Sequence, residues 1–177
     1  MSPYNGNVVV LETPRLILRQ FVAEDAEALA EVLCDRDNMR FYPEPFTRAD
    51  CDRWIEKSLW RYREQGHGLW AAIGKSDGQF LGDCGLAIQD VNGVEETEVG
   101  YHLARRFQGR GFATEAARAC MQFAFVTLKR PRVISLIRPD NLRSRRVAER
   151  NGMGVTGETE WAGLPHLIYA RSSELFV

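Results

Sequence analysis

A glycine-rich turn in the third quarter of the chain has the residue types of a phosphate-binding site. Residues 108–113 read Gln-Gly-Arg-Gly-Phe-Ala, between a predicted strand and a run of small residues that favours a helix. Glycines let the backbone turn tightly and direct successive N–H groups into one space, where the start of a helix adds partial positive charge. The turn is neither a Walker A loop, since no Gly-Lys-Ser/Thr follows, nor a dinucleotide fingerprint, since a meander of strands precedes it. We therefore expect it to bind phosphate in another arrangement.

Basic residues are concentrated around the same turn. The formal net charge is −1, yet residues 104–150 hold 12 Lys and Arg against 3 Asp and Glu, whereas residues 1–103 hold 10 against 18. Arg105, Arg106 and Arg110 flank the turn, and their charge favours a ligand with several phosphates. The alternative to a phosphate-binding role is that these basic residues form a surface exposed only to solvent. Nucleic acid is not expected as a partner, because the arginines are not interleaved with aromatic residues and the total charge is near zero.

The elements that position the turn follow from the hydropathy pattern. Residues 15–19 predict a short strand, and apolar residues at helical spacing predict a helix over 26–33. A second helix begins at Thr47, because Asp50 three residues later completes a capping box, and it ends near Gly66.

Alternating patterns then predict an antiparallel meander, in which Asn92-Gly93 is a hairpin signal. After the turn come a long helix, a strand, a short helix closed by Gly152, and one or two final strands. This order predicts an α/β (α+β) fold, with a mixed and mostly antiparallel central sheet flanked by helices, in a single domain over residues 1–177. The strands are expected over 69–73, 79–86, 97–103, 133–137 and 167–170, and the helices over about 113–129 and 144–151.

Composition narrows the class of protein further. With 177 residues, 45% hydrophobic and 27% charged, the chain is long enough to fold without disulfides or metals. No apolar run reaches the ~18 residues of a membrane span, and residues 1–20 lack the apolar stretch of a secretory signal. We expect a soluble cytoplasmic protein with no membrane partner and no metal. The cysteines, which form no C-x-x-C pair and are expected to be reduced packing thiols, are Cys34, Cys51, Cys84 and Cys120.

The glycine-rich turn resembles the pyrophosphate loop of the GNAT N-acetyltransferases, a family that transfers acetyl from acetyl-CoA to an amine. That loop reads Gln/Arg-x-x-Gly-x-Gly/Ala, and Gln108, Gly111 and Ala113 fit it. Other segments resemble the RimJ/RimL branch, whose enzymes acetylate the N-termini of ribosomal proteins. In order along the chain they are residues 11–19, 25–29, 81–86, 100–103, 113–116 and 141–153.

This resemblance implies a GNAT acyl-CoA N-acyltransferase fold with acetyl-CoA as co-substrate. In such a fold the central sheet splays open at the cofactor site, so that the strand 97–103 pairs its backbone with the pantetheine arm. The implied cofactor-binding residues lie at the end of that strand, in the turn and in a late motif. They are Tyr101, His102, Leu103, Gln108, Gly109, Arg110, Gly111, Phe112, Ala113, Thr114, Asn141 and Ser144.

Acetyl transfer needs a base, or a water chain leading to one, because an amine attacks the thioester only when it is unprotonated. We favour Glu98, since alternation along the strand places it on the same face as Gly100 and His102. The alternative is a solvated carboxylate beside Glu95 and Glu96. His102 is a rival base, although a position beside the cofactor arm would suit it equally.

The departing thiolate benefits from an acid, and the late motif offers one. Asn141 and Ser144 match an Asn-x-x-Ser of the RimJ/RimL branch, in which the asparagine bonds the cofactor arm and the serine lies near the sulfur. Many members outside this branch have a tyrosine acid seven residues after the asparagine, where this chain has Ala148. We therefore assign Ser144 as the acid, with helix capping as its alternative role. Many relatives also have an acidic residue five positions before this asparagine, which could act as the base. This chain has Leu136 there, so that alternative base is absent.

The acceptor is a primary amine, either a protein N-terminal α-amine or a small molecule such as an antibiotic or polyamine. The acidic first part of the chain favours a cationic amine. A catalytically inactive regulator that binds acyl-CoA is the other class of answer, and a homodimer is expected from family habit. Aromatic and histidine residues that would line the acceptor site, or instead belong to the core, are Phe41, Tyr42, Trp54, Trp70, Trp161, His166 and Tyr169.

Overall fold

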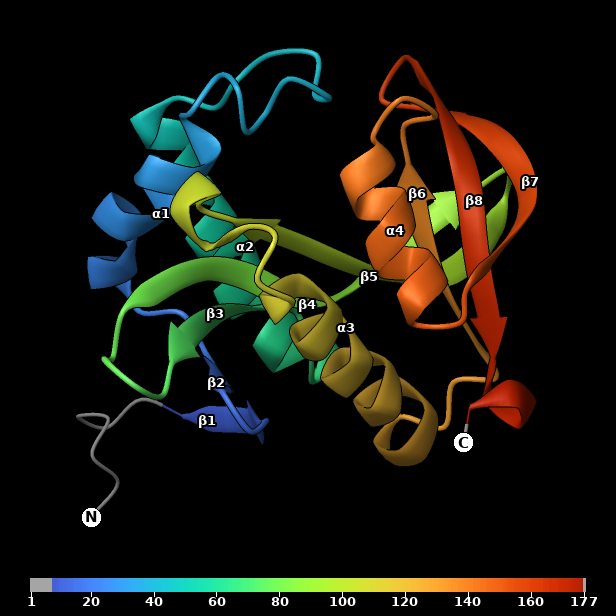
Figure 1. The fold of residues 1–177 in the computed structure, drawn as a ribbon, viewed down its shortest axis with the longest axis horizontal. Coiled ribbons are helices and arrows are strands. Elements are labelled where there is room, and N and C mark those ends of the chain that lie inside the picture. Colours follow the sequence, from blue (N-terminus) through green and yellow to red (C-terminus); the bar gives the residue numbers. More distant parts are fainter. Residues whose placement is uncertain (1–7, 177) are drawn as a thin grey trace.

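The computed structural model describes residues 8–176, and one eight-stranded sheet runs through them (Figure 1). The strand order is β1-β2-β3-β4-β5-β6-β8-β7, with β5 and β6 parallel and every other neighbouring pair antiparallel. The predicted mixed, mostly antiparallel α/β fold is confirmed. The strands are β1 (Val9–Glu12), β2 (Leu16–Arg19), β3 (Leu69–Gly74), β4 (Phe80–Val91), β5 (Val94–Leu103), β6 (Arg132–Ile137), β7 (Gly154–Trp161) and β8 (Leu164–Ser172).

Helices flank this sheet, with α3 and α4 in front of it in Figure 1 and α2 behind it. The capping box at the start of α2 forms as predicted, because the Asp50 side chain accepts from the Thr47 N–H at 2.7 Å. Gly66 ends α2 in the left-handed region, at φ 74°. No helix within residues 8–176 is long and apolar enough to cross a bilayer. The helices are α1 (Ala26–Leu33), α2 (Arg48–Gln65), α3 (Phe112–Gln122) and α4 (Leu142–Arg150).

The predicted meander is longer than its apolar pattern indicated. Strands β4 and β5 pair from Gly82 opposite Leu103 to Val91 opposite Val94, and Asn92 and Gly93 turn between them at φ 55° and 79°. The polar ends of the two strands extend the pairing past the apolar stretch. Strand β1 was not expected at all, and it forms by pairing with β2 at the edge of the sheet.

The long helix predicted over about 113–129 changes geometry near its end. Regular α-helix stops at Gln122, and a wider π turn continues over Phe123–Thr127, in which the Leu128 N–H donates to the Phe123 carbonyl at 3.1 Å. Its inner face packs into the core, where Ala116 and Cys120 are fully buried.

The core contains four free cysteines that approach one another in two pairs. Cys34 and Cys51 have their sulfurs 3.8 Å apart, and Cys84 and Cys120 have theirs 3.6 Å apart. These separations suit weak S–H hydrogen bonds between reduced thiols, as expected for cysteines that act as small apolar residues.

Candidate active site

Strands β5 and β6 separate after a single point of pairing, Glu98 opposite Ile134. Beyond that point, hydrogen bonds that involve side chains replace the backbone hydrogen bonds between the two strands. The Ser135 hydroxyl donates to the Val99 carbonyl at 3.1 Å, and the Leu136 N–H donates to Glu98 Oε1 at 3.2 Å. Figure 1 shows β5 diverging from β6 here. A cleft of about 940 Å³ opens at the divergence, so the splay expected of the sheet is present.

The start of α3 forms one wall of this cleft. Gly109 and Gly111 take left-handed conformations at φ 74° and 83°, and Gly111 is the N-cap of α3. The first intrahelical bond runs from the Glu115 N–H to the Gly111 carbonyl at 3.0 Å, which leaves the N–H groups of residues 112–114 without helical partners. The Thr114 hydroxyl is buried and has no partner among the described residues. This donor set fits the pyrophosphate of acetyl-CoA, as a phosphate would accept from these groups.

Two predicted cofactor residues of the turn, Gln108 and Arg110, also make contacts within the protein. The Gln108 amide donates to the Leu103 carbonyl at 2.9 Å and to Asn38 Oδ1 at 2.6 Å, and its oxygen accepts from Arg143 at 2.7 Å. Gln108 therefore holds the turn to the end of β5 and to α4. The Arg110 guanidinium lies outside the cleft lining, 5.1 Å above the Phe112 ring. Since Phe112 is the first residue of α3, this stacking keeps the Arg110 guanidinium beside the helix start.

The α4 side of the cleft brings Tyr101, Asn141 and Ser144 together. The Tyr101 hydroxyl donates to the Ser144 carbonyl at 3.1 Å, and the Ser144 N–H donates to Asn141 Oδ1 at 3.2 Å. Asn141 is therefore the N-cap of α4, a role that the sequence had left open for Ser144. All three residues line the cleft, and the Ser144 hydroxyl has no protein partner among residues 8–176.

Glu98 lies at the apex of the splay on the opposite face of β5 from Tyr101. Gln89 donates to Glu98 Oε2 at 2.8 Å and the Leu136 N–H donates to Oε1. Burial raises the pKa of this carboxyl above its ordinary value, while the two hydrogen bonds and the charges of His102 and Arg61 limit the rise. A carboxylate held in place, lining a cleft and more basic than usual, has the properties of a general base.

A hydrogen-bonded chain runs beside Glu98 on the same face. Asp83 is fully buried and accepts from His102 Nδ1 at 2.7 Å and from Trp54 Nε1 at 2.8 Å. His102 Nε2 lies 2.6 Å from the Tyr42 hydroxyl, from which the neutral imidazole would accept. Burial alone would lower the pKa of His102, but the charge and hydrogen bond of Asp83 and the charge of Glu98 raise it above its ordinary value.

The sequence did not assign a role to Asp83. The signal was available in Leu81-Gly-Asp-Cys84, where a carboxylate interrupts an otherwise apolar strand and must find partners when buried. His102 was predicted on the Glu98 face, either as a rival base or beside the cofactor arm, and it lies on that face in contact with Tyr42 and Trp54.

The candidate acceptor residues divide between cleft and core. Trp70 and Tyr169 are each 1% exposed and belong to the core. The others line the cleft, and they come from the connection between α1 and α2, from α2, from the end of β7 and from β8. They are Phe41, Tyr42, Trp54, Trp161 and His166.

Comparisons with known proteins agree with this geometry. Residues 15–154 match the acetyltransferase (GNAT) domain. The chain is 36% identical over 167 residues to the uncharacterized protein YkkB of Bacillus subtilis (strain 168), covering 92% of this chain and 95% of that one. An acetyltransferase (GNAT family) from Bacillus anthracis has a similar structure, with a TM-score of 0.79 and 25% identity over 93% of this chain and 98% of that one.

RimL, a ribosomal L7/L12 alpha-N-protein acetyltransferase in complex with coenzyme A, shares the fold with a TM-score of 0.76. Its identity is 20%, over 93% of this chain and 97% of that one. The GNAT family uses acetyl-CoA as its donor. With a matching domain over most of its length and the splayed sheet of that fold, the chain belongs to the GNAT family of acetyltransferases.

Proposed function

We propose that the protein transfers acetyl from acetyl-CoA to a primary amine by direct attack in a ternary complex. The observation that supports this most is the position of the cleft between β5 and β6, which exposes a different set of groups on each face of β5. The open N–H groups of α3, Asn141 and Ser144 lie on one face, and Glu98 lies on the other.

Each face has its own task in the proposed reaction. The start of α3 binds the pyrophosphate, and the open edge of β5 along Tyr101, His102 and Leu103 pairs with the pantetheine arm. Glu98 takes the proton of the incoming ammonium, directly or through water, so that the amine nitrogen can form a bond to the acetyl carbon. The carbon–sulfur bond then breaks, and the Ser144 hydroxyl supplies a proton to the departing thiolate. The serine regains a proton from the nitrogen of the tetrahedral intermediate, directly or through water, which leaves a neutral amide and the free thiol of CoA.

The acceptor is either an N-terminal α-amine or a small molecule. RimL is named as an alpha-N-protein acetyltransferase, and its similarity of fold makes peptides with free N-termini the first acceptors to examine. The proposal also includes one catalytic domain over residues 1–177, a cytoplasmic location and a homodimer. Analytical sedimentation would measure the mass of the dimer.

Thiol release from acetyl-CoA in the presence of an amine panel tests the proposal. We expect release that depends on both substrates, with initial rates that fit a ternary-complex mechanism. Parallel double-reciprocal lines would contradict direct attack, since they indicate an acetylated enzyme. Acetyl-CoA binding without release to any peptide, polyamine or aminoglycoside would favour a regulator that only binds acyl-CoA.

A further inference from the structure

The wall of the cleft on the Glu98 face holds more positive charge than the sequence suggested. The first part of the chain is acidic, which favoured a cationic acceptor, but only Asp37 and Glu98 among its carboxylates line the cleft within the described residues. Asp37 already pairs with Arg105 at 2.6 Å. The charge of a segment does not determine which of its side chains face a cavity, and here Lys57 and Arg61 do so.

Lys57 and Arg61 are neighbours on α2, four residues apart, and therefore lie on one face of the helix. No ion pair within 4.0 Å includes either of them in the part of the chain that the structure describes. By contrast, Arg48 and Arg53 on the solvent side of α2 pair with carboxylates of the same helix. Two adjacent like charges destabilise a helix unless an opposite charge meets them.

Arg61 is half-buried, whereas Lys57 is exposed at the cleft. Burial lowers the pKa of Arg61, and burial and the charge of Arg61 lower the pKa of Lys57. Arg61 and Glu98 both line the cleft, and no salt bridge joins them among the described residues. The charge of Glu98 raises the pKa of Arg61. An anion bound by Arg61 would thus share the cleft with the base.

A third cation faces the cleft from the other half of the sheet. Arg138 directly follows β6 and has a buried Nε without a partner among residues 8–176. It lies near His166, whose pKa is lowered by burial and by the charge of Arg138. The ring of His166 packs edge-on against Trp161 at 5.7 Å, which makes this wall aromatic and basic.

We propose that the acceptor amine bears an anionic group, a carboxylate or a phosphate, which Arg61 and Lys57 bind while the amine reaches Glu98. This inference rests on the proposed function, because it concerns the acceptor side of the same cleft. An anion gives the two unpaired cations a charge-assisted partner, whereas a polyamine or aminoglycoside would bring further positive charge beside them.

Matched amines that differ only in charge test the proposal. One pair is γ-aminobutyrate and its amide, a second is O-phosphoethanolamine and ethanolamine, and a third is a pair of amidated peptides, Ser-Glu-Ala-Ala and Ser-Gln-Ala-Ala. We expect kcat/KM to be about tenfold to one-hundredfold higher for the anionic member of at least one pair. The pair with the largest ratio identifies the source of the anion. Equal values within all three pairs, or a preference for neutral members, would overturn the proposal.

Substitutions on α2 test whether Arg61 causes the preference for anionic amines. Arg61→Gln should reduce the ratio of the anionic to the neutral member by about tenfold or more, and Arg61→Glu should invert it. Arg63→Gln is the matched control, because Arg63 is exposed on α2 and does not line the cleft. A ratio that Arg61→Gln leaves unchanged would overturn the assignment to this residue.

A binding experiment separates this inference from the proposed function. The same amines are titrated calorimetrically into the protein saturated with coenzyme A, where no acetyl transfer takes place. Preferential binding of anionic members supports the subsite even if no thiol release is ever seen, an outcome in which only the proposed function fails. Thiol release without charge preference in either experiment contradicts the subsite alone.

Discussion

Glu98 and His102 share one face of β5, and their charges influence each other. The His102 cation lowers the pKa of Glu98, and the Glu98 charge raises that of His102. Because Asp83 holds His102 Nδ1 and Tyr42 lies at Nε2, the imidazole has a fixed orientation at the edge of the cleft. The basicity of the proposed catalytic carboxylate therefore depends on the hydrogen-bonded network that holds His102.

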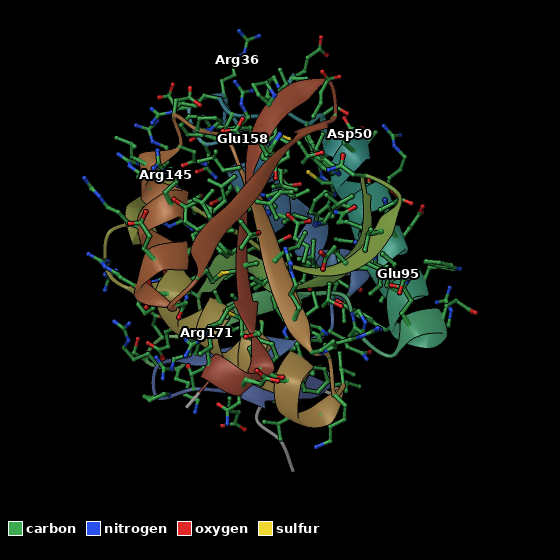
Figure 2. All side chains as sticks on the ribbon, turned by 90° about the vertical axis from the view of Figure 1, so that its right-hand side faces the viewer. Arg36, Asp50, Glu95, Arg145, Glu158 and Arg171 are labelled. Carbon is green, nitrogen blue, oxygen red and sulfur yellow. The ribbon has the colours of Figure 1, made fainter. Side chains whose placement is uncertain are left out.

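Replacing Glu98 by glutamine should remove the proposed base while keeping its shape. We expect turnover to fall about one-hundredfold or more, with little change in acetyl-CoA affinity. Since a base works only when deprotonated, wild-type kcat/KM should fall as the pH drops through the raised pKa of Glu98, and this acidic limb should vanish in Glu98→Gln. Glu95→Gln is the control, because Glu95 lies at the periphery of the molecule in Figure 2 and should keep the wild-type profile. A Glu98→Gln rate equal to the wild-type rate at every pH from 6 to 9 would remove Glu98 as the base.

Replacing His102 by glutamine tests its influence on Glu98. Loss of the nearby cation should raise the pKa of Glu98, so the acidic limb of the kcat/KM profile should move to higher pH. A purely structural role for His102 would lower activity or stability without moving the limb. Profiles that superimpose after scaling would therefore contradict the electrostatic role.

At the scale of elements, the start of α3 connects the edge of the sheet with the cleft. Glu115 in its first turn accepts from the Thr13 hydroxyl at 2.6 Å, and it accepts from the backbone and side chain of Arg15 at 2.9 and 2.6 Å. These bonds hold α3 against the turn between β1 and β2. They explain why an acidic residue stands in a helix start whose neighbours are proposed to bind phosphate.

Glu115→Gln should destabilise the fold by about 1 to 3 kcal/mol, because charged hydrogen bonds are weakened. Burial alone would raise the pKa of Glu115, but its bonds to Thr13 and Arg15 lower it below the ordinary value. The stabilisation is thus complete above the unfolded-state pKa and is lost as the pH falls through the folded-state pKa. Denaturant unfolding should show a difference from wild type that shrinks in acid. Glu56→Gln, at an exposed position of α2, should show no difference from wild type at any pH. A difference for Glu115→Gln that persists in acid would contradict the role assigned to these hydrogen bonds.

Gly111, the N-cap of α3, has the left-handed conformation that leaves the first N–H groups of the helix open to the cleft. At φ 83° a valine would be strained, and its Cβ would come within 3.2 Å of the Arg15 guanidinium, so the turn that carries the N–H groups would have to shift. We expect Gly111→Val to lower acetyl-CoA affinity at least tenfold. Gly78→Val has a similar strain, at φ 70° with open space around it, in a turn that does not line the cleft. Equal affinities of the two variants would contradict binding at this turn.

At the scale of the whole molecule, the sheet consists of two parts, β1–β5 and β6–β8, that meet at one parallel pair. Figure 2 looks onto the second part, with Glu158 on the outer strand β7 and Arg145 on the flank of α4. The cleft takes residues from both parts. A ligand in it would contact α3 on one side and α4 on the other, so binding should couple the two parts.

Local patterns predicted much of this arrangement. The capping box at Thr47, the Asn92-Gly93 hairpin and the glycine-rich turn depend on a few neighbouring residues, and all three formed where expected. Features that depend on packing between distant segments were not predicted. Strand β1 requires its partner, and Asp83 gains its role only when His102 and Trp54 come near.

The side chains that face the cleft were equally hidden from the sequence. Arg110 stays a predicted cofactor residue, and its stacking on Phe112 is a contact that becomes visible only in three dimensions. Lys57 and Arg61 belong to an acidic part of the chain, yet both line the cleft.

The central claim is that the cleft between β5 and β6 binds acetyl-CoA. Calorimetric titration of the wild-type protein with acetyl-CoA tests it most directly, with dephospho-CoA and ATP as controls. We predict saturable binding of one acetyl-CoA per chain, weaker binding of dephospho-CoA, and none of ATP at the same concentrations. Absence of acetyl-CoA binding, or equal binding of ATP, would contradict the account.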